Sequence, residues 1–187
     1  ESSTLGLDAA FGDRAFATTA NSGNYDRAGF EIDGLATEGD CEITSLIYLT
    51  DISSTIPTLI LNGAGTSESS RTGYLFWARP ATSNLTIKKA INGSETTLAS
   101  ATLDYGSGNH IIRFATVTDG GSIELTASTE ELGNPANTTT LTATDASPLA
   151  DGFAGIGVVS SDNNANQIRW GHIGVGLNGA AAPTEPV

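Results

Sequence analysis

The chain has 187 residues and a mass of 19.1 kDa, which suits one domain with a well-filled core. Its 8 basic and 21 acidic residues give a formal charge of −13, which disfavours nucleic acid and anionic membranes as partners. No run of about 18 apolar residues is present to span a bilayer. The chain starts at Glu1 and contains no methionine, which indicates a processed form or one piece of a longer product.

The chain contains one cysteine and 22 glycines, and these counts bear on its disulfides and its secondary structure. A single cysteine cannot form an intrachain disulfide. Cys41 lies in an apolar strand pattern, which predicts a buried, unreactive thiol rather than a nucleophile. The many glycines, together with frequent Ser and Thr, favour short strands joined by tight turns. No window has a helical period over three turns, so we expect at most one or two short helical turns.

The first third of the chain predicts several short strands. Residues 1–24 suggest one or two edge strands with irregular connections. Further strands are predicted over 28–32, 41–50 and 58–61, with a turn over 33–40 and a loop over 62–70. The run 41–50 becomes apolar on both faces towards its end, which is typical of a central strand.

A β-meander is predicted over 71–100, and the rest of the chain is organised around it. The first run, 73–79, contains three aromatic residues. Loop-forming residues at 80–84 separate it from a second run in which apolar residues alternate with Thr86 and Lys88. Asn92-Gly93 then suits a type I′ turn, because both central residues of that turn need positive φ. A third strand follows over 95–100.

The last third continues the same pattern. Strands over 110–117 and 122–128 flank the hairpin signal Thr-Asp-Gly-Gly, followed by a predicted loop over 130–138 and a strand over 139–144. Two more strands are predicted over 153–159 and 167–175. About a dozen strands favour an all-β, two-sheet antiparallel sandwich, which we place in one domain over 1–179. The prolines in 180–187 predict an extended, unpacked tail or linker.

Seven segments, in chain order, carry a resemblance to a known family: GYLFWAR, LTIKKAINGSETTLAS, HIIRF, GGSIELTAS, LTATD, GFAGIGVV and IRWGHIGVG. Their order and hairpin spacing resemble the concanavalin A-like lectin/glucanase jelly roll, over roughly 28–179. The resemblance is strongest to versions on structural proteins of tailed bacteriophages. It implies two large antiparallel sheets, one convex and one concave, with the concave face as the usual place for a glycan.

The catalytic motif of that fold is incomplete in this chain. Glucanases of the fold carry two catalytic glutamates, in the pattern Glu-x-Asp-x-Glu or Glu-x-Asp-x-x-Glu, on one strand. Here Glu31-Ile32-Asp33 is followed by Leu and Ala where the second glutamate would stand, and Glu38 lies beyond a glycine-containing turn. Retaining hydrolysis needs the carboxylate pair on one face. We therefore interpret Glu31 and Asp33 as strand-end and turn residues and predict that the chain is not an enzyme.

No metal or cofactor site is expected. His110 and His172 are the only histidines and form no zinc-binding motif. The segment 161–164 could supply oxygen ligands to Ca²⁺, which domains of the resembled fold often bind. It contains one carboxylate and no regular spacing, so a solvated turn is favoured over a calcium site.

Aromatic and planar polar side chains are the candidates for contacting a sugar. Strand alternation puts Trp77 and Arg79 on the face opposite Tyr74 and Phe76, so Trp77 is expected to be the more exposed ring. We predict carbohydrate contacts at Trp77, Arg79 and Tyr105. The competing interpretation is that the aromatic rings, including Trp170, belong to the core.

Two functional hypotheses remain open. The first is a non-catalytic virion protein that decorates a capsid or belongs to a tail, contacts other virion subunits, forms a homo-oligomer and adheres to host glycans at the virion surface. The second is a carbohydrate-binding module of a secreted bacterial polysaccharide-active enzyme. A fold alone does not decide between them.

Overall fold

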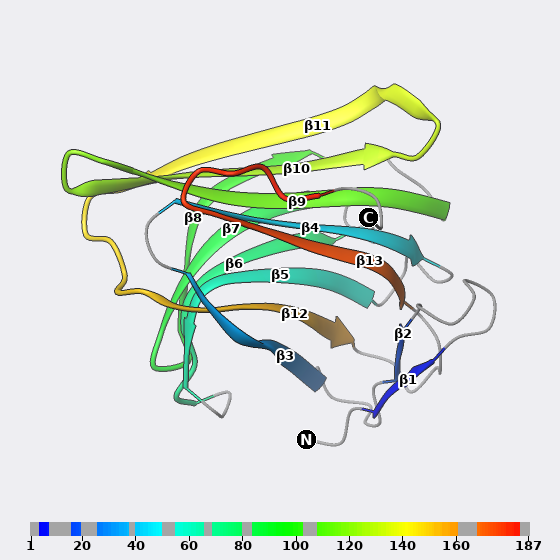
Figure 1. The fold of residues 1–187 in the computed structure, drawn as a ribbon, viewed down its shortest axis with the longest axis horizontal. Helices are drawn as coiled ribbons and strands as arrows, with labels where there is room; N and C mark the ends of the chain where they lie inside the picture. Colours follow the sequence, from blue (N-terminus) through cyan, green and yellow to red (C-terminus); the bar gives the residue numbers. More distant parts are fainter. Residues whose placement is uncertain are drawn as a thin grey trace.

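A computed structural model describes residues 4–7, 16–19, 26–37, 40–49, 55–65, 69–79, 84–102, 108–160 and 168–183. Every regular element in these ranges is a strand, and the strands form two antiparallel sheets (Figure 1). The seven-stranded sheet runs, in order, β1 (Thr4–Leu7), β2 (Phe16–Thr19), β13 (Ile168–Leu177), β4 (Cys41–Leu49), β9 (Gly108–Asp119), β10 (Ser122–Glu131) and β11 (Asn134–Asp145). The six-stranded sheet runs β3 (Asp26–Thr37), β12 (Gly152–Ser160), β5 (Thr55–Ala64), β6 (Thr72–Arg79), β7 (Asn84–Ile91) and β8 (Ser94–Thr102).

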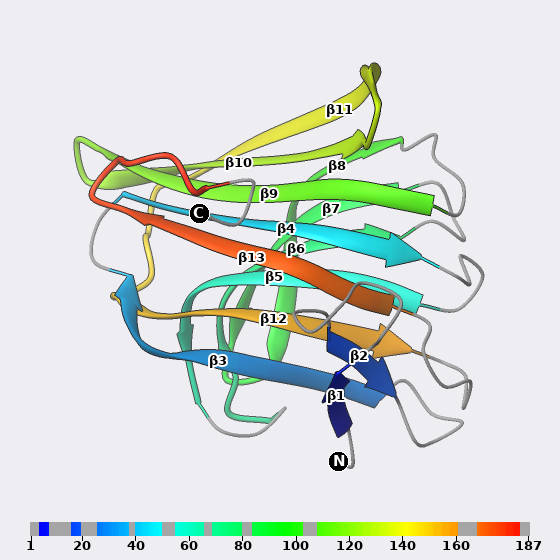
Figure 2. The same cartoon turned by 45° about the vertical axis from the view of Figure 1, so that its right-hand side comes forward.

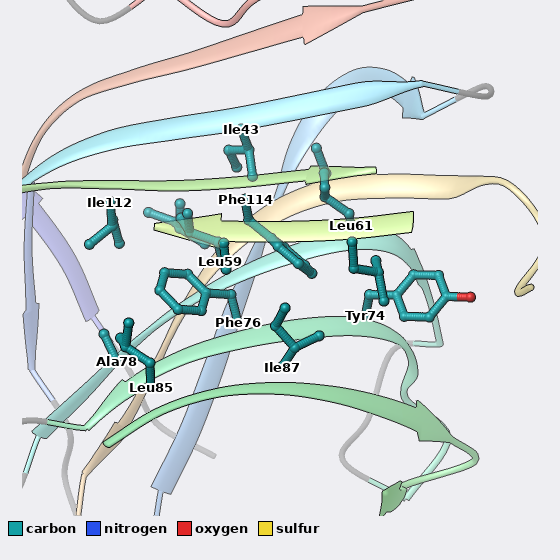
Figure 3. Close-up of a cluster of buried hydrophobic side chains, with 14 of the residues drawn as sticks. Ile43, Leu59, Leu61, Tyr74, Phe76, Ala78, Leu85, Ile87, Ile112 and Phe114 are labelled. Atoms are coloured by element: carbon teal, nitrogen blue, oxygen red, sulfur yellow. The ribbon is translucent and has the colours of Figure 1, made fainter. Parts of the chain in front are cut away.

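The two sheets stack face to face as a sandwich, with β8 and β11 meeting along one side (Figure 2). The main core lies between the sheets and takes alternate residues from strands whose side chains the structure describes. On β9, for example, His110, Ile112, Phe114 and Thr116 are buried, and the residues between them are half-buried. Figure 3 shows Ile112 and Phe114 of β9 converging with side chains of the other sheet, such as Phe76 and Ile87. The two-sheet sandwich predicted from the sequence is thus confirmed.

An aromatic contact joins the two sheets near the middle of the core. The rings of Phe76 on β6 and Phe114 on β9 lie with their centroids 6.0 Å apart and their planes tilted by 38°. Tilted aromatic pairs of this kind contribute about 0.5–1.5 kcal/mol beyond the area they bury. The core interpretation of Tyr74, Phe76 and Trp170 is therefore correct, because all three are fully buried.

The predicted meander forms β6, β7 and β8. Asn92 and Gly93 have φ of 49° and 78°, as a type I′ turn requires. The Gly93 amide also donates to the carbonyl of Arg71 at 2.8 Å, which ties the β7–β8 hairpin to the chain entering β6. The second predicted hairpin forms β9 and β10, with Gly120 and Gly121 at positive φ.

Strands extend into two segments that were expected to be loops. The segment expected to turn at 33–40 continues β3 to Thr37, because an irregularity opposite β12 lets the strand pair again beyond Glu31. The expected loop over 130–138 is a tight turn at Leu132-Gly133, where Gly133 has a φ of 85°. Pro135 does not prevent pairing there, because β11 is an edge strand.

The beginning of the expected tail is also packed rather than free. After the turn at Asn178-Gly179, residues 180–183 fold back over β13, with Ala182 buried. A Cβ added to Gly176 would collide with the carbonyl of Ala180, and one added to Gly174 would collide with that of Pro183. The glycines of β13 thus leave the space in which this segment lies. The expectation of an unpacked segment fails for these four residues, and 184–187 lie outside the described residues.

A polar network ties the end of β11 to the six-stranded sheet. Tyr74 donates its hydroxyl hydrogen to Asp145 at 2.8 Å, and the Lys89 ammonium lies 2.6 Å from the same carboxylate. The backbone amides of Ser147 and Leu149 donate to Asp145 and to the Tyr74 hydroxyl. Burial by itself raises the pKa of Asp145, but hydrogen bonds from Lys89, Ser147 and Tyr74 outweigh it and lower that pKa.

Replacing Asp145 by Asn should lower the free energy of unfolding by about 2–3 kcal/mol, because the Lys89 ammonium loses its buried partner. The pKa of Asp145 is lower in the folded state than in the unfolded state. The stabilisation that its carboxylate provides is therefore complete above the unfolded pKa of about 3.9, and it is lost as the pH falls through the folded pKa. Urea unfolding at pH 7 and at pH 3 measures both effects. Asp119→Asn, in an exposed turn, is the control. Equal losses for the two variants, or a D145N deficit that persists at low pH, would contradict the role of the network.

Candidate functional site

The face of the six-stranded sheet that points away from the core carries a second apolar cluster. We call this face the outer face. Its buried members are Ile56, Ile60, Leu75, Trp77 and Ala90, with Phe153 packed against them. Alternation along β6 explains the division, because Tyr74 and Phe76 enter the main core and Leu75 and Trp77 point the other way. Apolar side chains therefore cover both faces of this sheet.

Trp77 lies on the predicted face, but its ring is only 8% exposed. The ammonium of Lys88 lies 3.3 Å from the ring centroid. Lys88 pairs with Leu75 across β6 and β7, two residue pairs away from Trp77 and Thr86, so it reaches the indole diagonally. Trp77 is thus more exposed than Tyr74 and Phe76, as expected, but it is still buried, and a neighbouring side chain occupies one face of the ring.

An ion-pair network holds Lys88 in this position. Glu95, at the start of β8, lies 2.9 Å from the Lys88 ammonium through Oε2 and 2.5 Å from the Arg71 guanidinium through Oε1. The three side chains are only 13–17% exposed, so solvent and salt screen these pairs less than they would on an open surface. One carboxylate therefore holds two cations, of which the Lys88 ammonium lies against the indole.

Hydroxyl groups complete the surroundings of Trp77. Thr86, half-buried, pairs with Ser100, and Lys88 pairs with Thr97, so these side chains form adjacent rows of the same face. Thr97 and Ser100 are exposed. An aromatic ring can stack on a sugar ring, and the polar groups on the same face can hydrogen-bond the sugar hydroxyls.

The side chains of the other two predicted sugar-binding residues are not among those that the structure describes. Arg79 ends β6 and pairs with Asn84, and its side chain is outside the described part of the structure. Tyr105 lies outside the described residues altogether. The structure instead places Lys88 against Trp77, with Glu95 and Arg71 linked to Lys88 by ion pairs. The hairpin at Asn92-Gly93 was the sequence signal for this arrangement, since it sets Lys88 almost opposite Glu95.

The remaining candidates from the sequence are the acidic residues around Glu31, the single cysteine and the two histidines. Glu31 and Asp33 both lie within β3 rather than at a strand end and in a turn, and Glu38 lies outside the described residues. Cys41 is buried, and desolvation followed by the nearby Glu42 charge raises its pKa to about 11, which keeps the thiol protonated. His110 is buried on β9, and His172 lies 3.0 Å from the carbonyl of Pro183.

The described residues contain neither a metal-binding cluster nor a membrane-spanning helix. No group of three or more His, Cys, Asp and Glu side chains gathers there to hold a metal ion. The calcium candidate at 161–164 falls outside the described ranges. Within the part of the chain that the structure describes, no helix has the length and apolarity needed to cross a membrane.

Comparison with known proteins supports the architecture through structure rather than sequence. No family model and no curated protein matches the chain. A legume lectin-like domain from Entamoeba histolytica matches with a TM-score of 0.62 at 8% identity, over 95% of this chain and 88% of that one. Carbohydrate-binding module CBM66 from Bacillus subtilis matches with a TM-score of 0.55 at 12% identity, over 93% and 91%. The CBM2 module of the evolved Dit of Lactobacillus casei BL23 phage J-1 matches with 0.53 at 12%, over 91% and 77%.

These matches span nearly the whole chain and share its two antiparallel sheets. The chain has a concanavalin A-like jelly-roll fold. Identities of 8–12% establish the fold alone, so a ligand for this jelly roll must be argued from its own side chains.

The Glu95 network should be measurable as stability. Glu95→Gln removes the charge that holds Arg71 and Lys88, and we expect the free energy of unfolding to fall by about 1–2 kcal/mol in low salt. Urea unfolding in 20 mM and in 1 M sodium chloride tests this, and the loss should shrink in high salt as screening increases. Glu124→Gln, on an exposed part of β10, is the matched control. Indistinguishable losses in the two variants would show that the network adds no stability.

Proposed function

We propose that this jelly roll is a non-catalytic carbohydrate-binding module whose saccharide lies on the outer face of the six-stranded sheet, at Trp77. One observation carries the proposal. The indole of Trp77 on this face lies against the Lys88 ammonium of β7, and Glu95 of β8, which also pairs with Arg71, holds that ammonium. Sites for small polar ligands combine an apolar floor with a few fixed polar groups in this way.

Charge favours a neutral saccharide over an acidic one. The chain carries a net charge of −13, which repels an anionic polymer at long range. At short range, Glu95 already neutralises one of the two cations of the face and would repel a ligand carboxylate. The hydroxyls of Thr86, Thr97 and Ser100 suit a polyhydroxylated ligand without charge.

The same surface offers poor conditions for glycoside hydrolysis. Hydrolysis by paired carboxylates needs two such groups flanking the scissile bond. The strands β5 to β8 contain one carboxylate, Glu95, and it is paired with Lys88 and Arg71. These strands therefore lack the second carboxylate that such a reaction needs. Binding without cleavage is therefore the function that this surface supports best.

A role on a virion is the second candidate. It is favoured by one structural match, the module from a phage Dit protein. In this proposal the domain sits at the virion surface, contacts other virion subunits, assembles as a homo-oligomer and adheres to a host glycan through the same outer face. Mass spectrometry of purified particles from the source tests it. Presence of the chain in the particles would favour this role, and its absence would favour a module of a secreted protein.

Thr97→Arg should block the saccharide without disturbing the core. Thr97 is exposed and pairs with Lys88, so an arginine there would extend over the Trp77 surface. Truncating Trp77 itself is a poorer test, because the ring is only 8% exposed and its loss would cost stability. We expect T97R to weaken binding by about tenfold or more, equivalent to about 1.4 kcal/mol.

The measurement is isothermal titration calorimetry with neutral oligosaccharides selected on a glycan array. The matched control is Thr142→Arg, the same substitution at an exposed strand position on the other sheet. It should bind like the wild type. If T142R lost affinity and T97R did not, the proposed face would be the wrong one. If the wild type bound no glycan on the array, the function itself would be rejected.

A further inference from the structure

Lys88 occupies the position that a stacked saccharide would need, and this inference rests on the proposed function. Its ammonium lies 3.3 Å from the centroid of the Trp77 ring. That separation is van der Waals contact, so no sugar ring can lie on the same face of the indole while the ammonium remains there. Saccharide binding and the Lys88–Trp77 contact are therefore mutually exclusive on that face.

The second partner of Lys88 makes its displacement inexpensive. Glu95 Oε2 lies 2.9 Å from the ammonium, and Arg71 holds the other oxygen of the same carboxylate. A lysine side chain has four rotatable bonds, so its ammonium can leave the ring and keep the pair with the anchored carboxylate. Only the cation–π contact is lost in this movement.

We propose that Lys88 is a displaceable cover of the Trp77 site, which competes with the saccharide for the indole and limits its affinity. The cover protects an apolar ring that would otherwise be exposed on the surface of the free protein. Neutral saccharides are the ligands concerned, because stacking on the indole requires no charge. Removing the cover should therefore tighten saccharide binding by about three- to tenfold, the factor expected from loss of a partly buried cation–π contact.

The experiment combines two readouts on the wild type, Lys88→Ala and Arg113→Ala. R113A removes the same charge from the other sheet and is the matched control, since Arg113 lies on β9 and is about one-third exposed. The first readout is acrylamide quenching of tryptophan fluorescence. The chain has two tryptophans, and Trp170 is fully buried in the main core, so a change in quenching reports on Trp77. The second is calorimetric titration with cellohexaose, laminarihexaose, xylohexaose and mannohexaose.

We expect K88A to be quenched more strongly than the wild type and to bind the preferred hexasaccharide more tightly, with R113A unchanged in both. Unchanged quenching in K88A would overturn the inference whatever the titrations give, because Lys88 would then not cover the ring. Increased quenching with equal or weaker binding would overturn the competition and make Lys88 a direct ligand. Increased quenching with no binding of any of the four sugars by wild type or variant would reject the proposed function, and the competition with it.

Discussion

The burial of β6 on both faces is the constraint on which the rest of the structure depends. Tyr74, Phe76 and Ala78 belong to the core between the sheets, and Leu75 and Trp77 belong to the cluster on the outer face. A strand buried on both sides cannot shift register by one residue without exchanging its two sets of side chains. The position of Trp77 is thus determined by the same packing that joins the two sheets through Phe76 and Phe114.

The two lysines of the chain form polar contacts on opposite faces of the six-stranded sheet. Lys88 and Lys89 are neighbours on β7, so their side chains leave on opposite sides. Lys89 meets Asp145 and ties β7 to the end of β11, across the side of the sandwich where β8 and β11 meet. Lys88 meets Glu95 and Trp77 on the outer face. The contacts of Lys89 stabilise the fold, and the contacts of Lys88 define the proposed binding surface.

Much of the fold was predictable because it depends on local pattern. Period-two alternation and the turn residues Asn92-Gly93 and Gly120-Gly121 placed the meander and the second hairpin correctly. The errors at 33–40, 130–138 and 180–183 have a different cause. In each, glycines or a proline suggested a break. The segment 130–138 instead closes a tight turn with β10, and the other two depend on a partner distant in sequence. The segment beyond Glu31 pairs with β12, and residues 180–183 pack over the glycines of β13.

The candidate site was predictable only in part. Alternation gave the correct face for Trp77, since it is a property of one strand. Its low exposure depends on Lys88, a residue on the next strand whose reach is set by cross-strand register. The ion pair between Arg71 and Glu95 joins the residue before β6 to the start of β8, and no pattern within a single strand predicts it. The net charge of −13 likewise gave no sign that a cation would lie against an indole.

The central claim is that a neutral saccharide binds the outer face of the six-stranded sheet at Trp77. The most direct measurement is a ¹⁵N-labelled NMR titration with an oligosaccharide that binds, followed at the two tryptophan indole N–H signals. The account predicts that the Trp77 signal shifts with saccharide concentration, together with the amides of Thr86 and Thr97, and that the Trp170 signal stays in place. A saturable titration that leaves Trp77 unmoved and shifts the amides of Thr126 and Thr142 on the other sheet would contradict it.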